Sequence, residues 1–310
     1  MKITSVAAAV IERPDGSFLL GQRAPDTVYS GYWEFPGGKI EAGETPRQAL
    51  DRELQEELGI GVRKAYPWLL REHRYAHAHV QLHFFRVVEW VGEPRDRVHS
   101  ALSWQQPGAT CVAPMLPANA PILKALTLPT IYAITRAGEC GIEPQLRALD
   151  EALARGVRLV QVREPLLAAD ARAAFARAVC RRCQAVGGRV LLNGDVALAR
   201  DVGADGVHLP AWQLRALDRR PDFPLVAASC HNAIELEAAA HWALDFAVLG
   251  PVSATASHPG RVPLGWEGFS DLIAGSGLPV YALGGMARAD LDHARSLGAH
   301  GIAAIRAAWD

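Results

Sequence analysis

The sequence has almost no net charge. Its 32 lysine and arginine residues balance 33 aspartate and glutamate residues, and the formal charge is −1 at pH 7. Without a basic field the chain has little to hold a long phosphate backbone, so we expect no nucleic-acid polymer among its partners. Single sites in a neutral protein can still be positive, which leaves room for a small anionic ligand.

Long apolar segments are missing as well. No run reaches the roughly 18 residues that cross a bilayer, and the N-terminus lacks the layout of a signal peptide. We therefore expect a cytoplasmic protein with no membrane partner. Nothing in the sequence indicates an oligomeric state.

The sequence also lacks an even, regularly spaced set of cysteines. Its five cysteines are scattered, which fits free thiols in a reducing compartment. Cys180 and Cys183 form a C-x-x-C inside a helical-looking segment, with no second pair nearby. We expect these two side chains to pack in a helix rather than to serve zinc or redox chemistry.

A chain of 310 residues is long enough for two domains, and its pattern changes near residue 127. For residues 1–127 we expect an α/β domain. Its predicted strands are 3–13 and 17–22, joined as a hairpin by the turn at 14–16, then 67–74 and 79–91. A helix is predicted from the N-cap Thr45 to Leu58, before Gly59, and a short one at 119–126.

Residues 128–310 show short apolar strands that alternate with helical segments, which is typical of βαβ units. Eight such units predict a TIM-like (β/α)₈ barrel. The predicted strands are 130–135, 158–163, 188–193, 205–209, 224–230, 245–252, 279–284 and 301–305. At their C-terminal ends, where barrel sites form, stand Arg163, Asn193, His208, Ser229, His231, Ser253, Thr255, Gly284 and Gly285.

The strongest chemical pattern lies in the first helix. At about 100° per residue, Glu53, Glu56 and Glu57 fall on one helical face, where like charges repel. A hard divalent cation offsets that repulsion, and Mg²⁺ favours a few carboxylates together with substrate phosphate oxygens. A solvated acidic face is the other explanation for a helix rich in glutamate.

The stretch from Gly38 to Ile60 contains G-x5-E-x7-R-E-L-Q-E-E-L-G-I, which matches the Nudix box, and residues 1–126 resemble the MutT family. This resemblance implies an α/β/α sandwich and hydrolysis of a nucleoside diphosphate linked to another moiety. It implies that Mg²⁺, with Mn²⁺ as a substitute, binds Glu53, Glu56 and Glu57 beside Gly37 and Gly38. By the same resemblance, Arg52 orients Glu53 and Glu44 supports that arrangement.

Further segments resemble those that bind the nucleotide in MutT. They imply substrate contacts for Arg23, for Phe35 as a wall of the base pocket, for Gly38 and Lys39, and for Asn119 at the edge of 8-oxoguanine. Taken alone, Asn119 between two prolines is more typical of a turn or a helix N-cap. Two departures stand out: residues 75–79 contain no arginine, and residues 97–99 lack the acidic residue of MutT.

Residues 130–310 resemble the thiamine phosphate synthase/TenI family. The resemblance rests on the segments 161–163, 192–194, 203–209, 250–252 and 282–286. It implies a phosphate cradle at Gly284 and Gly285 and a thiamine-related phosphate ligand.

The synthase reaction itself is not expected. Synthases carry a lysine where this chain has Pro165, and they hold Mg²⁺-pyrophosphate with an aspartate pair where this chain has Gly194 and Trp212. His231 belongs to the segment 229–231, which resembles TenI, in which a histidine at this place moves a proton during thiazole tautomerisation. A loop histidine without a catalytic task is an equally open interpretation.

Three functional hypotheses follow. The first is an Mg²⁺-dependent 8-oxo-dGTP diphosphatase that acts in nucleotide-pool sanitation and DNA repair, with a tautomerase as a second activity. The second makes the barrel a phosphate-binding sensor or scaffold without turnover. The third gives the Nudix site another nucleotide or a thiamine-precursor pyrophosphate as substrate.

Overall fold

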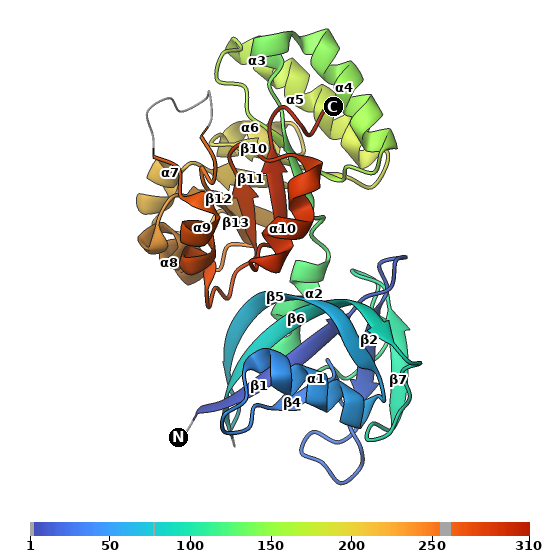
Figure 1. Cartoon of the computed structure of the whole chain (residues 1–310). Coiled ribbons are helices and arrows are strands. Elements are labelled where there is room, and N and C mark those ends of the chain that lie inside the picture. The colour runs from blue at the N-terminus through green and yellow to red at the C-terminus, as the bar shows by residue number, and fades with distance from the viewer. Residues whose placement is uncertain (1–2, 77, 255–261) are drawn as a thin grey trace. The chain divides into compact units, whose positions relative to one another are not determined.

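The computed structural model describes residues 3–76, 78–254 and 262–310. The chain divides into two compact units, Met1–Leu128 and Pro129–Asp310 (Figure 1). No helix in the described ranges is long and apolar enough to cross a membrane.

The first unit contains two β-sheets. In the mixed sheet, β1 (Ile3–Ile11) pairs antiparallel with β4 (Gly37–Lys39) and parallel with β6 (His79–Val91), which pairs antiparallel with β5 (Gly61–Arg74). In the second sheet, β2 (Phe18–Gln22) lies between β3 (Trp33–Glu34) and β7 (Ala101–Gln105).

The predicted hairpin at 3–22 is wrong in one respect. The turn forms, and Arg13 N–H donates to the carbonyl of Ser17, but only one bridge, between Glu12 and Phe18, joins its two arms. β1 and β2 then separate into different sheets. Long-range pairing of β1 with β6 replaces local pairing, because both faces of β1 are apolar and can be buried. Strand β7 was not predicted from the sequence.

Helix α1 (Pro46–Glu57) begins as the sequence predicts. The Thr45 hydroxyl accepts from Gln48 N–H, the Gln48 side chain returns a bond to Thr45 N–H, and Pro46 occupies the first turn. The helix ends before Gly59, whose φ of 73° is one that glycine adopts without strain. Helix α2 (Ala120–Leu126) follows the short 3₁₀ helix η1 (Pro117–Asn119).

Strand β1 lies between two apolar cores, so that successive side chains enter opposite cores. Ala7 and Ile11 face the core that contains Leu50 and Leu54 of α1, while Val10 faces the core that contains Ile122 of α2. The unit is therefore the α/β/α sandwich that was expected. Figure 1 shows α1 lying against β1 and β4.

The second unit is a closed barrel of eight parallel strands, as expected. Its strands are β8 (Ile131–Ile134), β9 (Leu159–Val162), β10 (Arg189–Asn193), β11 (Gly206–Leu209), β12 (Leu225–Cys230), β13 (Phe246–Leu249), β14 (Val280–Leu283) and β15 (Gly301–Ala304). Each lies within the corresponding predicted range. The strands pair in chain order, and β15 closes onto β8.

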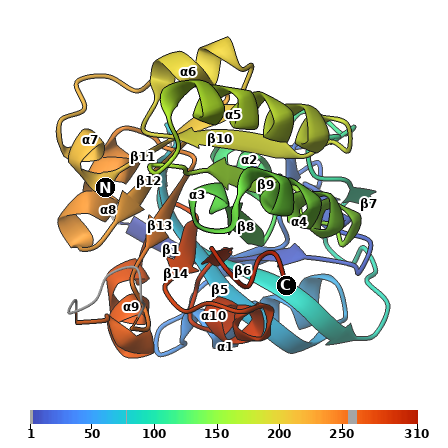
Figure 2. The same cartoon turned by 90° about the horizontal axis from the view of Figure 1, so that it is seen from above.

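Helices surround the barrel (Figure 2). They are α3 (Ala137–Cys140), α4 (Ile142–Ala154), α5 (Ala169–Gln184), α6 (Val196–Asp201), α7 (Ala211–Arg215), α8 (Ala233–His241), α9 (Gly265–Ile273), η2 (Arg288–Asp290) and α10 (Leu291–Ser296). Both cysteines of the C-x-x-C are free and buried in α5, and burial raises the pKa of Cys180 to about 11 and of Cys183 to about 12.

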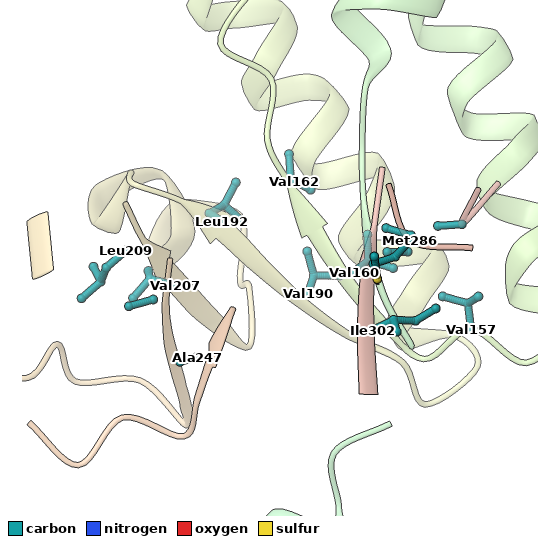
Figure 3. Close-up of a cluster of buried hydrophobic side chains, with 14 of the residues drawn as sticks. Val157, Val160, Val162, Val190, Leu192, Val207, Leu209, Ala247, Met286 and Ile302 are labelled. Carbon is teal, nitrogen blue, oxygen red and sulfur yellow. The ribbon is translucent and has the colours of Figure 1, made fainter. Parts of the chain in front are cut away.

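Successive side chains along the barrel strands point to opposite sides of the sheet and form two layers. Val160, Val190 and Val207 pack in one apolar cluster with the surrounding helices, as Figure 3 shows for the strand side chains. The residues that follow or precede them on the strands, such as Gln161 and His208, point to the other side, into the barrel. Polar side chains of the strands thus lie inside the barrel, while apolar side chains pack outward against the helices.

Candidate functional site

The acidic helix of the first unit contacts the glycine strand β4 through two glutamates. Gly37 N–H donates a 3.0 Å hydrogen bond to Glu57 Oε2. A side chain at Gly38 would come within 2.3 Å of the Glu53 carboxylate, and one at Gly37 within 2.1 Å of the Ala7 carbonyl oxygen. Both glycines are therefore required for the close approach of strand and helix.

Arg52 fixes the other acidic side chains. Its guanidinium donates to Glu44 at 2.7 and 3.0 Å, to Glu53 Oε1 at 2.9 Å and to Glu56 Oε2 at 3.4 Å, and it also contacts the Lys39 carbonyl at 3.0 Å. The bond from Arg52 is the main cause that lowers the pKa of Glu44 to about 2. Arg52 thus holds Glu53 toward β4, as expected for a positioning residue.

Glu57 has the most perturbed carboxyl group of this site. Its pKa is raised to about 8, mainly by burial and also by the negative charges of Glu34 and Glu53, against the hydrogen bond from Gly37. A desolvated carboxylate beside two others is unfavourable until a cation joins it. This electrostatic arrangement is suited to a divalent metal ion.

A cavity of about 430 Å³ opens beside these groups. It is lined on one side by Gly37, Gly38 and Lys39. Arg23 lies in its wall and holds Glu34 through two bonds of 2.7 and 2.8 Å. Three expected residues, Arg23, Gly38 and Lys39, therefore border one cavity.

The far wall of this cavity is aromatic and apolar. The rings of Tyr29 and Tyr75 lie 5.4 Å apart, and Val80, Leu82 and Leu116 complete the wall. Tyr29 has a φ of 59°, an uncommon conformation that turns the 23–32 loop at this position. A flat ring with a phosphate tail matches a cavity of this composition.

Phe35 does not line the cavity. Its side chain is 5% exposed and packs against Phe18 and Phe84, with ring centroids 5.8 and 5.7 Å away. The expectation that Phe35 forms a wall of the base pocket stays a prediction. On a strand-like segment adjacent side chains point to opposite faces, so Glu34 faces the cavity and Phe35 faces the core.

Asn119 is buried at the end of η1 and occupies the N-cap position of α2. The residue is 4% exposed, and its side chain makes no capping bond to α2. Its amide nitrogen lies 3.4 Å from the Trp33 carbonyl oxygen. Leu116, three residues earlier, lines the cavity, whereas Asn119 does not. Its role toward a base stays a prediction.

The two departures from MutT fall at different places. In the segment 75–79, which contains no arginine, Tyr75 and Ala78 line the cavity, while His77 lies outside the described residues. Arg97 donates to the Gln55 carbonyl at 3.0 Å and lies against Gly59, so this loop contacts the end of α1.

In the second unit, a chain of hydrogen bonds crosses the barrel interior. Asn193 donates to Gln161 at 3.2 Å, Gln161 donates to Tyr132 Oη at 3.1 Å, and His208 contacts Tyr132 at 3.3 Å and Ser229 Oγ at 2.8 Å. Burial lowers the pKa of His208 to about 3, so the imidazole is neutral at pH 7. His208 is 1% exposed, and its role in the barrel site stays a prediction.

His231 lies after β12 and contacts Glu235. Its Nδ1 is 3.0 Å from Glu235 Oε2, and its backbone N–H donates to the same oxygen at 2.7 Å. Arg215 also pairs with Glu235. The carboxylate thus fixes the orientation of the imidazole.

Gly284 and Gly285 both have positive φ values, 110° and 72°, after β14. A side chain at Gly284 would come within 2.8 Å of Val252 N, so the two segments approach closely there. Thr255, which was expected nearby, lies outside the described residues.

Comparisons with known proteins match the two units separately. The profile described as "NUDIX domain" matches residues 1–126, and the profile described as "Thiamine monophosphate synthase" matches residues 131–308. The chain belongs to both families. It is a Nudix hydrolase domain followed by a thiamine monophosphate synthase/TenI domain.

Three relatives illustrate this division. The Nudix domain is 40% identical to the CTP pyrophosphohydrolase of Escherichia coli K12 and 38% identical to the 8-oxo-dGTP diphosphatase of Haemophilus influenzae, each over 40% of this chain and 92% of the relative. The TenI domain is 32% identical to the thiamine-phosphate synthase of Azorhizobium caulinodans, over 57% of this chain and 86% of the relative.

Across the described ranges, no three histidine, cysteine or acidic side chains converge as a metal site, and Arg52 pairs with Glu53 and Glu56. Glu53 and Glu57 nevertheless flank Gly37 and Gly38 together. Since Mg²⁺ takes only a few carboxylates and completes its shell with water and phosphate, these residues fit the ion.

Sequence reasoning did not single out Glu34, Tyr29 or Tyr75. Glu34 was detectable, because it alternates with the apolar Trp33 and Phe35 and must point to the opposite face. The two tyrosines lie in irregular segments, where no periodicity indicates a direction. Only the fold brings them together.

Proposed function

We propose that the Nudix domain is an Mg²⁺-dependent pyrophosphohydrolase that converts 8-oxo-dGTP and water to 8-oxo-dGMP and diphosphate. The observation that supports it is the contact of Glu57 and Glu53 with the Gly37–Gly38 strand, directly beside a cavity that holds Arg23 and an aromatic wall. Two relatives are named for pyrophosphate hydrolysis of nucleotides.

Each part of this site has a separate task. Bound Mg²⁺ would neutralise phosphate charge and make a water molecule more acidic. Glu53 and Glu57 would hold the ion, and a carboxylate of this cluster that is not bound to the ion would accept the proton of the attacking water. Arg52 keeps Glu53 in place, while the Gly37–Gly38 backbone leaves room for the phosphates.

The cavity selects the rest of the substrate. Its about 430 Å³ accommodates a nucleoside between the Tyr29–Tyr75 pair and the apolar strand residues, with Arg23 close to the anionic tail. Asn119 is buried three residues after Leu116 of this wall, and we propose that its amide reaches the purine edge after a small movement of Leu116.

The direct test is a substrate panel with the full chain. We expect Mg²⁺-dependent release of diphosphate from 8-oxo-dGTP, with kcat/KM at least tenfold above that for dGTP and CTP, and no release in EDTA. Preference for CTP or for a thiamine-precursor pyrophosphate would contradict the proposed substrate but not the assignment as a hydrolase. Turnover in EDTA would contradict the metal assignment.

We propose as a second candidate that the barrel is a thiazole tautomerase. The supporting observation is the His231–Glu235 contact, which occupies Nδ1 and leaves Nε2 for proton transfer. His231→Ala should lower tautomerisation by roughly 10²-fold or more. Binding of a thiazole phosphate without turnover, unchanged in the variant, would instead make the barrel a ligand-binding module.

A further inference from the structure

The loop between β6 and β7 lacks the acidic residue of MutT, yet hydrogen bonds fix it at both ends. Arg97 N–H donates to the Glu57 carbonyl at 3.2 Å, at the end of α1. Just after the loop, Ser100 N–H donates to the Gln22 carbonyl of β2 at 2.8 Å. The loop therefore holds His99 between α1 and β2.

His99 is buried against a glycine of β2. The residue is 9% exposed, and its Nδ1 has no hydrogen-bond partner in the described part of the chain. A side chain at Gly21 would come within 2.3 Å of the His99 ring. Gly21 lies directly opposite Glu34 in the pairing of β2 with β3. Because the side chains of directly paired residues point to the same face, the imidazole occupies the place beside Glu34 that a side chain at Gly21 would fill.

The Glu34 carboxylate lies between this imidazole and the guanidinium of Arg23. Arg23 donates to it at 2.7 and 2.8 Å, whereas His99 Nε2 is 3.9 Å from Glu34 Oε1. The longer distance exceeds that of a hydrogen bond, so the imidazole covers the carboxylate without donating to it. Burial, and second the charge of Arg23, lower the pKa of His99, which favours the neutral ring. A neutral ring does not draw the carboxylate away from Arg23.

Arg23 is fixed through two of its three guanidinium nitrogens. Nη1 donates to both oxygens of Glu34, and Nε donates to the Val28 carbonyl at 2.7 Å. Within the described ranges Nη2 has no protein acceptor, and Arg23 lines the cavity. The direction of Nη2 thus depends on where Glu34 holds the guanidinium. Water in place of the imidazole would solvate Glu34 and weaken its pairing with Arg23, because ion pairs weaken as the local dielectric rises.

We infer that His99 is a positioning residue for substrate binding, whose imidazole excludes water from Glu34 and thereby keeps Arg23 directed at the anionic part of the nucleotide. In the described structure His99 is outside the set of residues that line the cavity, so it acts through Glu34 and Arg23. The inference rests on the proposed hydrolysis of nucleotides. It gives the loop that lacks the acidic residue of MutT a task in substrate binding.

The first test measures steady-state kinetics of full-chain variants with the nucleotide that the unaltered chain hydrolyses fastest. His99→Ala should raise KM roughly fivefold or more and change kcat less than about twofold, because binding depends on Arg23 and the metal chemistry does not. Gly21→Ala should have the same effect, since its methyl group would displace an intact imidazole. An unchanged KM in either variant, or an equal loss of kcat, would overturn the inference.

A double-mutant cycle then shows whether His99 acts through Arg23. Arg23→Gln should raise KM by itself, and His99→Ala added to it should raise KM no further. Additive increases, or an unchanged KM in Arg23→Gln, would contradict the inference.

His79→Ala is the matched control. His79 is as buried as His99 and contacts a carboxylate, that of Glu72, at 3.3 Å, but it does not line the cavity among the described residues. This variant should lose stability in thermal unfolding, as His99→Ala does, while its KM stays unchanged. An equal rise of KM in the control would mean that loss of any buried histidine impairs binding, and it would overturn the inference.

A second readout does not depend on turnover. In the substrate-free full chain, Arg23 Nε–H donates to the Val28 carbonyl and should give a protected NMR signal. The signal should persist in His79→Ala and shift or disappear in His99→Ala. If the unaltered chain hydrolyses no nucleotide, the proposed function fails, whereas an unchanged Arg23 signal in His99→Ala would refute the positioning role itself.

Discussion

Gly37 N–H and Glu57 Oε2 are joined by a 3.0 Å hydrogen bond, which ties the last turn of α1 to the strand beside it. This bond stabilises the ionised carboxylate, yet burial dominates and raises the pKa of Glu57 to about 8. The group is thus half-buried and oriented, with a raised pKa that a bound cation would lower. Two predictions rest on this relationship.

Glu53→Gln and Glu57→Gln should each lower turnover by roughly 10²-fold or more, because metal binding and proton transfer both depend on these carboxylates. Circular dichroism should be unchanged. Asp51→Asn is the matched control on α1, since Asp51 is exposed and pairs only with Arg47 among the described residues. A glutamine variant that keeps more than half the activity would contradict the assignment.

Mg²⁺ binding should release a proton and strengthen as the pH rises from about 6 to 8, roughly tenfold per pH unit. Below pH 8 the carboxyl of Glu57 carries a proton in the metal-free fold. In the metal-free protein, the raised pKa of Glu57 contributes to the free energy of unfolding. This contribution is complete below the ordinary pKa of 4.5 and is lost as the pH rises through 8. Calorimetry in buffers of different ionisation enthalpy measures the number of protons released when Mg²⁺ binds. No release at pH 7 would refute this prediction.

Phe35→Ala should destabilise the Nudix domain by about 3–5 kcal/mol, because the ring fills the core against Phe18 and Phe84. Chemical denaturation gives this free energy of unfolding. Tyr75→Ala is the comparison variant: its half-exposed ring lines the cavity, so KM should rise with a smaller loss of stability. The reverse pattern would return Phe35 to the base pocket.

Asn119→Ala should lower kcat/KM for 8-oxo-dGTP more than for dGTP, since loss of a contact to the base edge removes selectivity and leaves the phosphate chemistry intact. Steady-state kinetics with both nucleotides decide this. Because Asn119 is buried near the Trp33 carbonyl, thermal unfolding must be measured as well. Equal losses on both nucleotides would show that the side chain is structural.

Much of the architecture was predictable because local signals and long-range packing agree. Thr45, Pro46 and Gly59 define α1 through capping chemistry, which depends only on neighbours in the chain. The barrel strands follow from apolar runs that stay buried on both sides. The hairpin at 3–22 fails because its turn is local, whereas the choice of partner for β1 depends on β6, whose paired residues lie 76 positions later in the chain.

The sequence by itself determined the spacing of Glu53, Glu56 and Glu57 on one helical face, since helix periodicity is a local property. It also determined the family of each half. Only the tertiary structure decided that Phe35 enters the core and Glu34 the cavity, that Tyr29 meets Tyr75, and that Asp195 binds Arg172. These outcomes depend on which segments distant in the chain pack together. Burial then decides which polar groups are left without a protein partner and can bind a ligand.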